Sequence, residues 1–289
     1  ESYAMQASLL TNLLLPLALG IIMLGLGLGL TLDDFRRVAR YPRAVLIGLA
    51  LQTLVLPWAA FGLALGFGLP AELAVGLMLL AASPGGATAN IYSHLARGDV
   101  ALNITLTAIN SLLCLLTLPV ILNLSLEYFL GAGQYVPPPT KKVVEVAAII
   151  LLPVAIGMVV RARAAGFAAR TEKPIRLLSV LVLALLVIAA VAQEWKTLTT
   201  YFAIVGLACL LFNLASMGAG YAAPLALRLP KKQAIAIAME IGIHNGTLAI
   251  YIALNVLQNP KISVPAAVYS LLMFLTAAVF AFWMARRSK

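Results

Sequence analysis

One carboxylate stands apart from the other acidic residues because it lies inside a long apolar run. Glu240 is well within the run 232–257, and no Lys or Arg lies at a comparable depth in any apolar run. A charge at the centre of a bilayer costs on the order of 3 kcal/mol and is retained where it has a partner. We expect a bound cation to be that partner. The alternative is a protonated Glu240 that is hydrogen-bonded to a neighbouring side chain.

Side chains that carry neutral oxygen atoms occur in other apolar runs and are candidate ligands for this cation. Asn103, Thr107 and Asn110 recur at helical spacing, which predicts that they share one face of a helix. Hard cations such as Na⁺ prefer oxygen, so a carboxylate with amide, hydroxyl and carbonyl oxygens suits sodium. The same residue types also join helices inside membranes, which is the structural alternative. The candidates are Gln52, Thr88, Asn90, Asn103, Thr107 and Asn110.

His244 is the only histidine deep inside an apolar run, since His94 is expected near the membrane interface. It follows Glu240 by four residues, so we expect both on one helical face. The imidazole could shape the site, donate to a ligand or relay a proton. A proton-coupled organic anion carrier that uses Glu240 and His244 is therefore the alternative to a sodium-coupled one. The same pair is the one candidate for an intramembrane enzyme, and no repeat of pore-lining polar residues indicates a channel.

The composition places these residues in a helical membrane protein. Of the 289 residues, 63% are hydrophobic and 10% are charged, with a mean hydropathy of +1.02. Soluble domains are about 45–50% apolar and about 25% charged, so a soluble enzyme, a disordered chain and a secreted scaffold are excluded. Cys114 and Cys209 are far apart and lack a C-x-x-C spacing, which predicts neither a disulfide nor a zinc site.

Apolar runs of about 20 residues predict nine transmembrane helices in an all-α polytopic fold. The predicted spans are 10–30, 43–68, 71–95, 100–130, 142–161, 175–193, 198–227, 232–257 and 263–284. The longest connectors are expected at 131–141 and 162–174. Residues 1–9 are expected to form an N-terminal segment, with vector-derived sequence at 1–4, and residues 285–289 a cytoplasmic tail.

The distribution of basic residues predicts the orientation. With the N-terminus outside, 16 of the 20 Lys and Arg residues face the inside, and the other four are Lys141, Lys142, Lys196 and Lys261. The positive-inside rule therefore predicts a multi-pass protein of the cell (inner) membrane with its C-terminus in the cytoplasm. The net charge of +10 is a signal of topology and a contact for anionic lipid, and no basic patch indicates nucleic acid.

Two segments 160 positions apart share a pattern. Leu69-Pro70 corresponds to Leu229-Pro230, and polar interruptions follow at Ser83-Pro84-Gly85-Gly86 and His244-Asn245-Gly246. The predicted topology makes the two segments run in opposite directions. Inverted, interrupted helices are typical of the binding site of a secondary transporter. The N–H groups after each break could bind an anion and the carbonyls before it a cation, whereas simple kinks at Pro and Gly are the alternative.

Four segments resemble the bile acid:sodium symporter family, in particular bacterial homologues of the apical sodium-dependent bile acid transporter. They are LGIIMLGLGLGLTLDDF at 19–35, QTLVLP at 52–57, SPGGATANIYSHLARGDVALNITLT at 83–107 and MEIGIHNGTLA at 239–249. The resemblance implies a core domain (43–130 and 198–284) with two crossing discontinuous helices, beside a panel domain (10–30 and 142–193). It also implies sodium-coupled import of an organic anion, such as a bile acid or related carboxylate, by alternating access.

The resemblance further implies two sodium sites and a substrate site, with no catalytic residue and no cofactor besides the coupling ion Na⁺. The expected partners are sodium ions, the organic anion and membrane lipid, and the chain is expected to be a monomer. The first sodium site would use Asn90, Asn103, Thr107 and Glu240. The second would use Gln52, Glu240, carbonyls near Ile241 and Ile243, and His244. The substrate would meet Ala87, Thr88, Asn245 and Gly246.

Three departures from the family pattern bear on these expectations. Position 244 is His in place of Gln, so the second sodium site is expected to be weakened or pH-sensitive. Position 89 is Ala where Ser is frequent, which removes one hydroxyl from the first site. Some bacterial relatives begin with an additional helix, and this chain is expected to have nine helices, with the panel domain one helix short.

Overall fold

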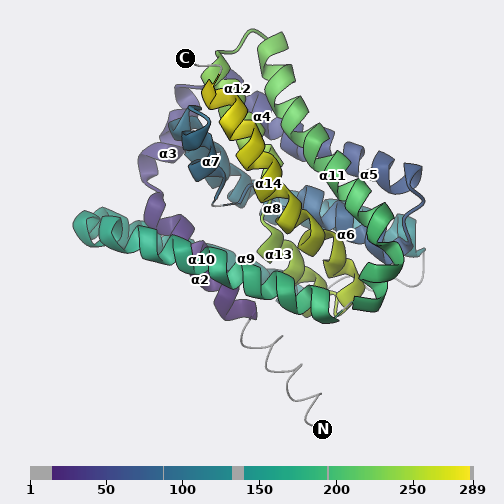
Figure 1. Ribbon diagram of the computed structural model, residues 1–289. Helices are drawn as coiled ribbons and strands as arrows, with labels where there is room; N and C mark the ends of the chain where they lie inside the picture. Colours follow the sequence, from purple (N-terminus) through teal and green to yellow (C-terminus); the bar gives the residue numbers. More distant parts are fainter. Residues whose placement is uncertain (1–14, 87, 132–139, 194, 287–289) are drawn as a thin grey trace.

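The computed structural model describes residues 15–86, 88–131, 140–193 and 195–286, which form helices joined by short turns (Figure 1). The first elements are α2 (Leu15–Gly29), α3 (Leu32–Arg36), the 3₁₀ turn η2 (Arg37–Ala39), α4 (Pro42–Ala50), the π-helical turn η3 (Leu51–Val55) and α5 (Leu56–Gly66). They are followed by α6 (Ala71–Ala82), α7 (Ala89–Leu95), α8 (Val100–Leu130), α9 (Thr140–Arg163), α10 (Ala165–Gln193) and α11 (Trp195–Ala226). The last are α12 (Lys231–Gly242), α13 (Gly246–Tyr251), the π-helical turn η4 (Ile252–Val256) and α14 (Pro260–Arg286).

Several of these helices have the length and composition of membrane spans. Within the described residues, four stretches qualify, namely Pro42–Gly66, Val100–Leu130, Trp195–Ala226 and Pro260–Arg286. A fifth qualifies if α2 and the α3–η2 segment, which meet at a bend of 74°, are taken as one span. Large apolar side chains such as Trp58, Leu116 and Val279 are exposed on the outer surface. Lipid is the solvent that such a surface requires, so the chain is a multi-pass helical membrane protein.

The expected connector at 162–174 is wrong. α9 ends at Arg163 and α10 begins at Ala165, so the connection is a single residue and Pro174 lies inside α10. The prediction followed the apolar run, which starts near residue 175. The preceding residues are rich in Ala and other helix-forming residues, and they extend the helix beyond its apolar part.

Three helices form a layer of their own. α2, α9 and α10 pack on one another, to one side of the remaining helices in Figure 1, and α10 also contacts α13 and α14. Glycine allows α2 and α9 to approach closely, because a Cβ at Gly27 would overlap the backbone of Val154 and one at Gly157 would overlap the backbone of α2. Small residues at such crossings are typical of helices packed within membranes.

Two short helices are buried in the other group. Every residue of α6 from Leu73 to Ala82 is buried, and so is every residue of α12 from Ala234 to Gly242. Both helices contact α14, while α6 also packs against α8 and α12 packs against α8 and α11. Apart from Glu240 both buried stretches are apolar, and a helix that is apolar all round belongs in the interior. Both helices end inside the protein, and their ends define the site described below.

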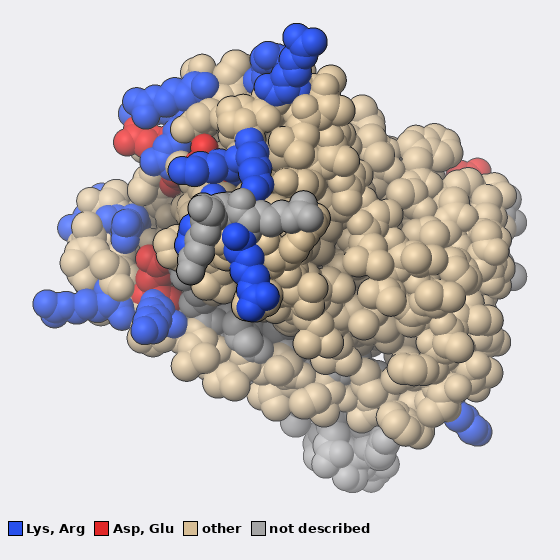
Figure 2. All heavy atoms as spheres, turned by 45° about the horizontal axis from the view of Figure 1, so that its top comes forward, with Lys and Arg blue, Asp and Glu red and all other residues tan. Residues whose placement is uncertain are grey.

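The basic residues are concentrated at one end of the molecule. Figure 2 shows most of the visible Lys and Arg side chains on the face at the top of Figure 1, near α3, α7 and the start of α12. Most of the remaining visible surface is uncharged. This segregation of charge is the pattern expected of a protein whose uncharged belt is surrounded by lipid.

Candidate functional site

The two interruptions predicted from the sequence are present and lie against each other. Gly86 N–H donates to the carbonyl of Ile243 at 2.6 Å, and Asn245 N–H donates to the carbonyl of Pro84 at 2.9 Å. Gly85 and His244 form an isolated antiparallel bridge at the same place. Both helices end rather than merely kink, and backbone groups that lipid could not satisfy are paired between the two breaks.

Gly85 provides the space for the buried acid. A Cβ at residue 85 would overlap the carboxyl carbon and both oxygens of Glu240. Gly85 is not among the residues with a left-handed backbone, so the requirement at this position is space rather than conformation. The break after α6 therefore accommodates the carboxylate that α12 carries.

Glu240 is fully buried and bound by side chains of α8. Thr107 Oγ1 donates to Glu240 Oε2 at 2.6 Å, and Asn110 Nδ2 donates to Glu240 Oε1 at 3.1 Å. One turn earlier, Asn103 Nδ2 donates to the carbonyl of Ala236 on α12 at 2.8 Å. The prediction that Asn103, Thr107 and Asn110 share one face is confirmed, since all three contact α12.

Amide oxygens without a hydrogen-bond donor occur on the helices that pack against α12. The Oδ1 atoms of Asn90, Asn103 and Asn110 are buried and have no hydrogen-bond partner. Asn103 and Asn110 already use Nδ2 as a donor, and Asn90 lies on α7, which packs against both α8 and α12. None of the ion pairs formed by the described residues involves Glu240. A carboxylate and amide oxygens that lack hydrogen-bond donors are the oxygen ligands that a hard cation prefers.

The expectation that Glu240 and His244 share a helical face is wrong. α12 ends at Gly242, and His244 lies in the bridge between the two breaks. Its Nδ1 lies 3.2 Å from the carbonyl oxygen of Ser83, whereas the Glu240 carboxylate turns toward α8. No hydrogen bond between the two side chains occurs among those found for the described residues.

Gln52 reaches the same carbonyl-bearing end of α6. Its Nε2 donates to the carbonyls of Ala81 at 3.1 Å and Ser83 at 3.0 Å, while its buried Oε1 has no partner. Ile241 and Ile243 are fully buried, and the Ile243 carbonyl accepts from Gly86. The residues expected at the second sodium site are thus close to one break, but N–H groups already donate to several of the carbonyls there.

Two residues that the sequence analysis did not predict donate hydrogen bonds at the end of α12. Asn213 Nδ2 on α11 donates to the Gly242 carbonyl at 2.9 Å, and the Tyr269 hydroxyl on α14 donates to it at 2.8 Å. Asn213 Nδ2 also lies 3.0 Å from the Tyr269 hydroxyl. The available signal was a lone Asn within the apolar run 198–227.

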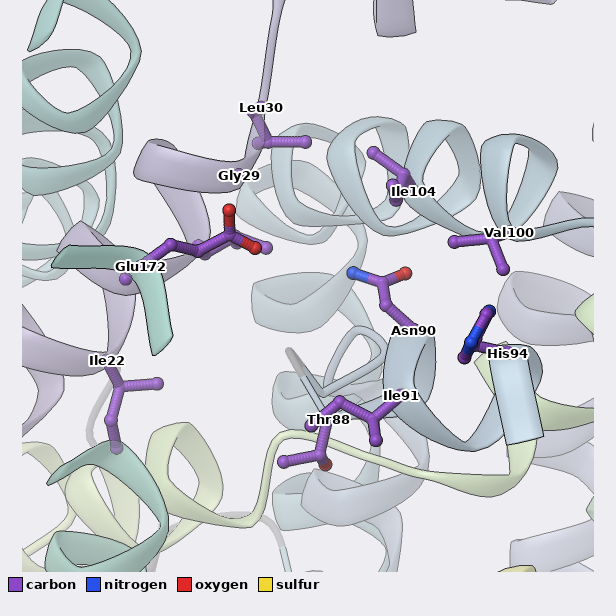
Figure 3. A pocket seen from close by; sticks show the side chains of 12 residues that line it. Ile22, Gly29, Leu30, Thr88, Asn90, Ile91, His94, Val100, Ile104 and Glu172 are labelled. Carbon is purple, nitrogen blue, oxygen red and sulfur yellow. The ribbon is translucent and has the colours of Figure 1, made fainter. Parts of the chain in front are cut away.

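A cavity of about 310 Å³ lies between α2 and α10 on one side and α7 and α8 on the other (Figure 3). Its polar lining comprises Thr88, Asn90, His94 and Glu172, and Figure 3 shows Glu172 and Asn90 on opposite sides. Glu172 also lies 4.0 Å from Arg161 Nη1 on α9. His94 was expected at the membrane interface, but it lines the cavity one helical turn after Asn90. The four-residue spacing from Asn90 was the sequence signal that could have predicted this position. Ligand pockets start at roughly this volume.

The other residues expected to bind substrate lie elsewhere. Asn245 and Gly246 are not among the lining residues of this cavity. Asn245 Oδ1 accepts from the Leu248 N–H at 3.0 Å and caps α13, and a Cβ at Gly246 would meet Ser270 on α14. Ala87 lies outside the described residues.

Comparisons with known proteins agree on one family. Residues 16–201 match the model of the Sodium Bile acid symporter family. The uncharacterized sodium-dependent transporter YocS of Bacillus subtilis is 30% identical over 272 residues, covering 94% of this chain and 83% of that protein. The probable sodium/metabolite cotransporter BASS2 of Oryza sativa is 29% identical over 93% of this chain and 64% of its own length. The ileal sodium/bile acid cotransporter of Oryctolagus cuniculus is 28% identical over 53% of this chain and 44% of its own length.

Proposed function

Because the chain belongs to the Sodium Bile acid symporter family, we propose that it is a sodium-coupled symporter that imports an organic anion by alternating access. The observation that carries the proposal is the fully buried Glu240 beside unpartnered amide oxygens. The relatives from Bacillus and rice are named as a sodium-dependent transporter and a sodium/metabolite cotransporter, which supports the same function.

Sodium would be held by Glu240 of α12, by Asn103 and Thr107 of α8 and by Asn90 of α7. The ion would supply the positive charge that a carboxylate needs in an apolar interior. Asn110, which already donates to Glu240, would keep the carboxylate in place. These residues come from both broken helices, so they would hold α7 and α12 in one arrangement.

Asn90 provides a physical route for coupling. It belongs to the proposed sodium set, and it also lines the cavity beside Thr88. Cation binding that orders Asn90 would therefore raise the affinity of the cavity for substrate, and by linkage substrate would raise the affinity for sodium. The cavity wall is mostly apolar, with residues such as Ile22 and Leu26, which suits the hydrocarbon part of a bile acid or related carboxylate.

The proposed architecture has nine spans and an inverted repeat. The pairs α6–α7 and α12–α13 would be the crossing broken helices of a core domain, and α2, α9 and α10 would be the panel domain. The matched breaks and the packing of α2, α9 and α10 on one another support this division. Movement of the panel against α7 and α8 would open the cavity alternately to the two sides of the membrane.

The charge distribution supports an orientation in the cell membrane. The basic end in Figure 2 would face the cytoplasm, with the N-terminus outside. His94 and Val100 of the cavity flank Arg97 in the sequence, so the cavity would lie toward the cytoplasmic half of the protein.

Uptake into proteoliposomes under an imposed sodium gradient tests the proposal. A labelled bile acid and a labelled small carboxylate would serve as substrates, with potassium replacing sodium as the reference condition. We expect sodium-driven uptake in the wild type and its loss in Glu240→Gln. The matched control is Glu127→Gln, because Glu127 is an exposed acid at the end of α8. Unchanged sodium-driven uptake in Glu240→Gln would overturn the assignment, and uptake that follows pH but ignores sodium would favour a proton-coupled carrier.

A further inference from the structure

The freed carbonyls at the two breaks already accept hydrogen bonds from the protein. At the end of α6, Ala81 and Ser83 accept from Gln52, and the Ser83 carbonyl also lies 3.2 Å from His244 Nδ1. At the end of α12, Gly242 accepts from Asn213 and Tyr269. The carbonyls of residues 84 and 243 accept from the backbone of the opposite break. Each of these five carbonyls already has at least one hydrogen-bond donor, so none of them needs a cation to be satisfied.

The His244 ring is a donor at this place. A carbonyl oxygen can only accept, so the contact with Ser83 is a hydrogen bond when His244 Nδ1 carries the proton. The other ring nitrogen, Nε2, is buried and has no hydrogen-bond partner. A neutral imidazole nitrogen suits zinc, copper, iron or nickel rather than sodium, which prefers oxygen. His244 therefore supplies no ligand that would attract a sodium ion to the end of α6.

Aromatic packing fixes the ring in this orientation. The His244 ring is stacked on Phe212, with centroids 5.6 Å apart and planes at 21°. It also meets Tyr269 edge-on at 5.4 Å and 65°, and the residue is 1% exposed. A side chain confined between two rings in a packed interior does not turn without displacing them. These two ring contacts therefore hold Nδ1 toward the Ser83 carbonyl.

The two ends of the site have opposite character. Next to Glu240, which itself accepts from Thr107 and Asn110, the amide oxygens of Asn103 and Asn110 lack donors, whereas the Ser83 carbonyl lies within hydrogen-bond distance of two N–H donors, Gln52 Nε2 and His244 Nδ1. We infer, on the basis of the proposed function, that this chain binds a single sodium ion, at Glu240. The N–H of His244 takes the role of a second cation by compensating the carbonyl-bearing end of α6. The second sodium site that the family resemblance implies does not fit the residues present.

The inference is tested by counting the sodium ions bound by the purified full chain. Equilibrium binding of radiolabelled sodium gives the number of ions per chain, and sodium titration of the thermal unfolding midpoint, at ionic strength held constant with choline chloride, gives the cooperativity. We expect one ion per chain and a Hill coefficient of 1 in the wild type. Two ions per chain in the wild type would overturn the inference and leave the proposed function standing. No saturable sodium binding at all would instead overturn the proposed function.

Substitution of His244 provides a gain-of-binding test. In His244→Gln an amide oxygen becomes available beside the Ser83 carbonyl and the unpartnered Gln52 Oε1, so we expect a second bound ion and a Hill coefficient approaching 2. His244→Leu removes the donor without adding an oxygen, and we expect it to bind one ion with a lower unfolding midpoint. A folded His244→Gln protein that still binds one ion would contradict the role given to His244. If that variant does not fold, the stoichiometry of the wild type decides the matter.

Discussion

Replacing Gly85 with alanine tests whether the break after α6 exists to make room for Glu240. The added methyl group would overlap the carboxyl carbon and both oxygens of Glu240. Gly85 does not have a left-handed backbone, so alanine can adopt its conformation and the effect is confined to the methyl group. Because the side chain of residue 85 would be a single rigid atom, the carboxylate is the group that has to move.

The expected magnitude follows from the contacts that the carboxylate would lose. It accepts from Thr107 at 2.6 Å and from Asn110 at 3.1 Å. A hydrogen bond to a charged group contributes about 1.5–3 kcal/mol, and each 1.4 kcal/mol is about tenfold in affinity. Loss of one such bond would raise the sodium concentration for half-saturation roughly 10- to 150-fold. Crowding in the sodium-free protein would lower its unfolding free energy by about 1–3 kcal/mol.

The assay is the sodium-dependent shift in the unfolding midpoint of the purified protein in detergent. Gly62→Ala is the matched control, because a Cβ at residue 62 meets nothing within 4 Å, and it should titrate like the wild type. A Gly85→Ala protein whose sodium titration is indistinguishable from that of Gly62→Ala would refute the reasoning. Its Glu240 carboxylate would then lie elsewhere than beside residue 85.

Three further substitutions separate sodium binding, substrate binding and packing. Thr107→Val keeps the shape of the side chain but removes the donor to Glu240, so half-saturation by sodium should rise about tenfold or more, and an unchanged titration would argue against this contact. Thr88→Val removes a hydroxyl from the cavity, so it should raise the substrate concentration for half-maximal uptake. Sodium binding measured without substrate should stay as in the wild type. A change in sodium binding alone would show that Thr88 does not belong to the substrate site. Tyr269→Phe removes one of two donors to the Gly242 carbonyl, so denaturant or thermal unfolding should show a loss of about 1 kcal/mol with sodium affinity retained, and a loss of sodium affinity would speak against a purely structural role.

Local chemistry made the breaks and the face of α8 predictable. Pro84 and the adjacent glycines do not continue a helix, and the polar residues around them have no place in lipid unless they face protein, water or a ligand. The face formed by Asn103, Thr107 and Asn110 follows from the helical period alone. Glu240 was identifiable because a lone carboxylate in an apolar run is costly and needs a partner.

Contacts between distant segments were not predictable from the local pattern. A helical period continued through residue 244 places His244 beside Glu240, but the bridge to Gly85 on the other break ends α12 at Gly242. The cavity likewise depends on α10 lying opposite α7, with the cavity between them. That arrangement brings Glu172, which the sequence places at the edge of a span, opposite Asn90.

Binding of radiolabelled sodium to wild type and Glu240→Gln, measured side by side on the purified full chain, tests the central claim most directly. The wild type and the exposed-acid control Glu127→Gln should show the same saturable binding. Glu240→Gln should show none, because its neutral amide cannot supply the charge around which the neighbouring oxygens are arranged. Saturable binding of the same affinity in Glu240→Gln would show that the cation lies elsewhere, and it would contradict the account.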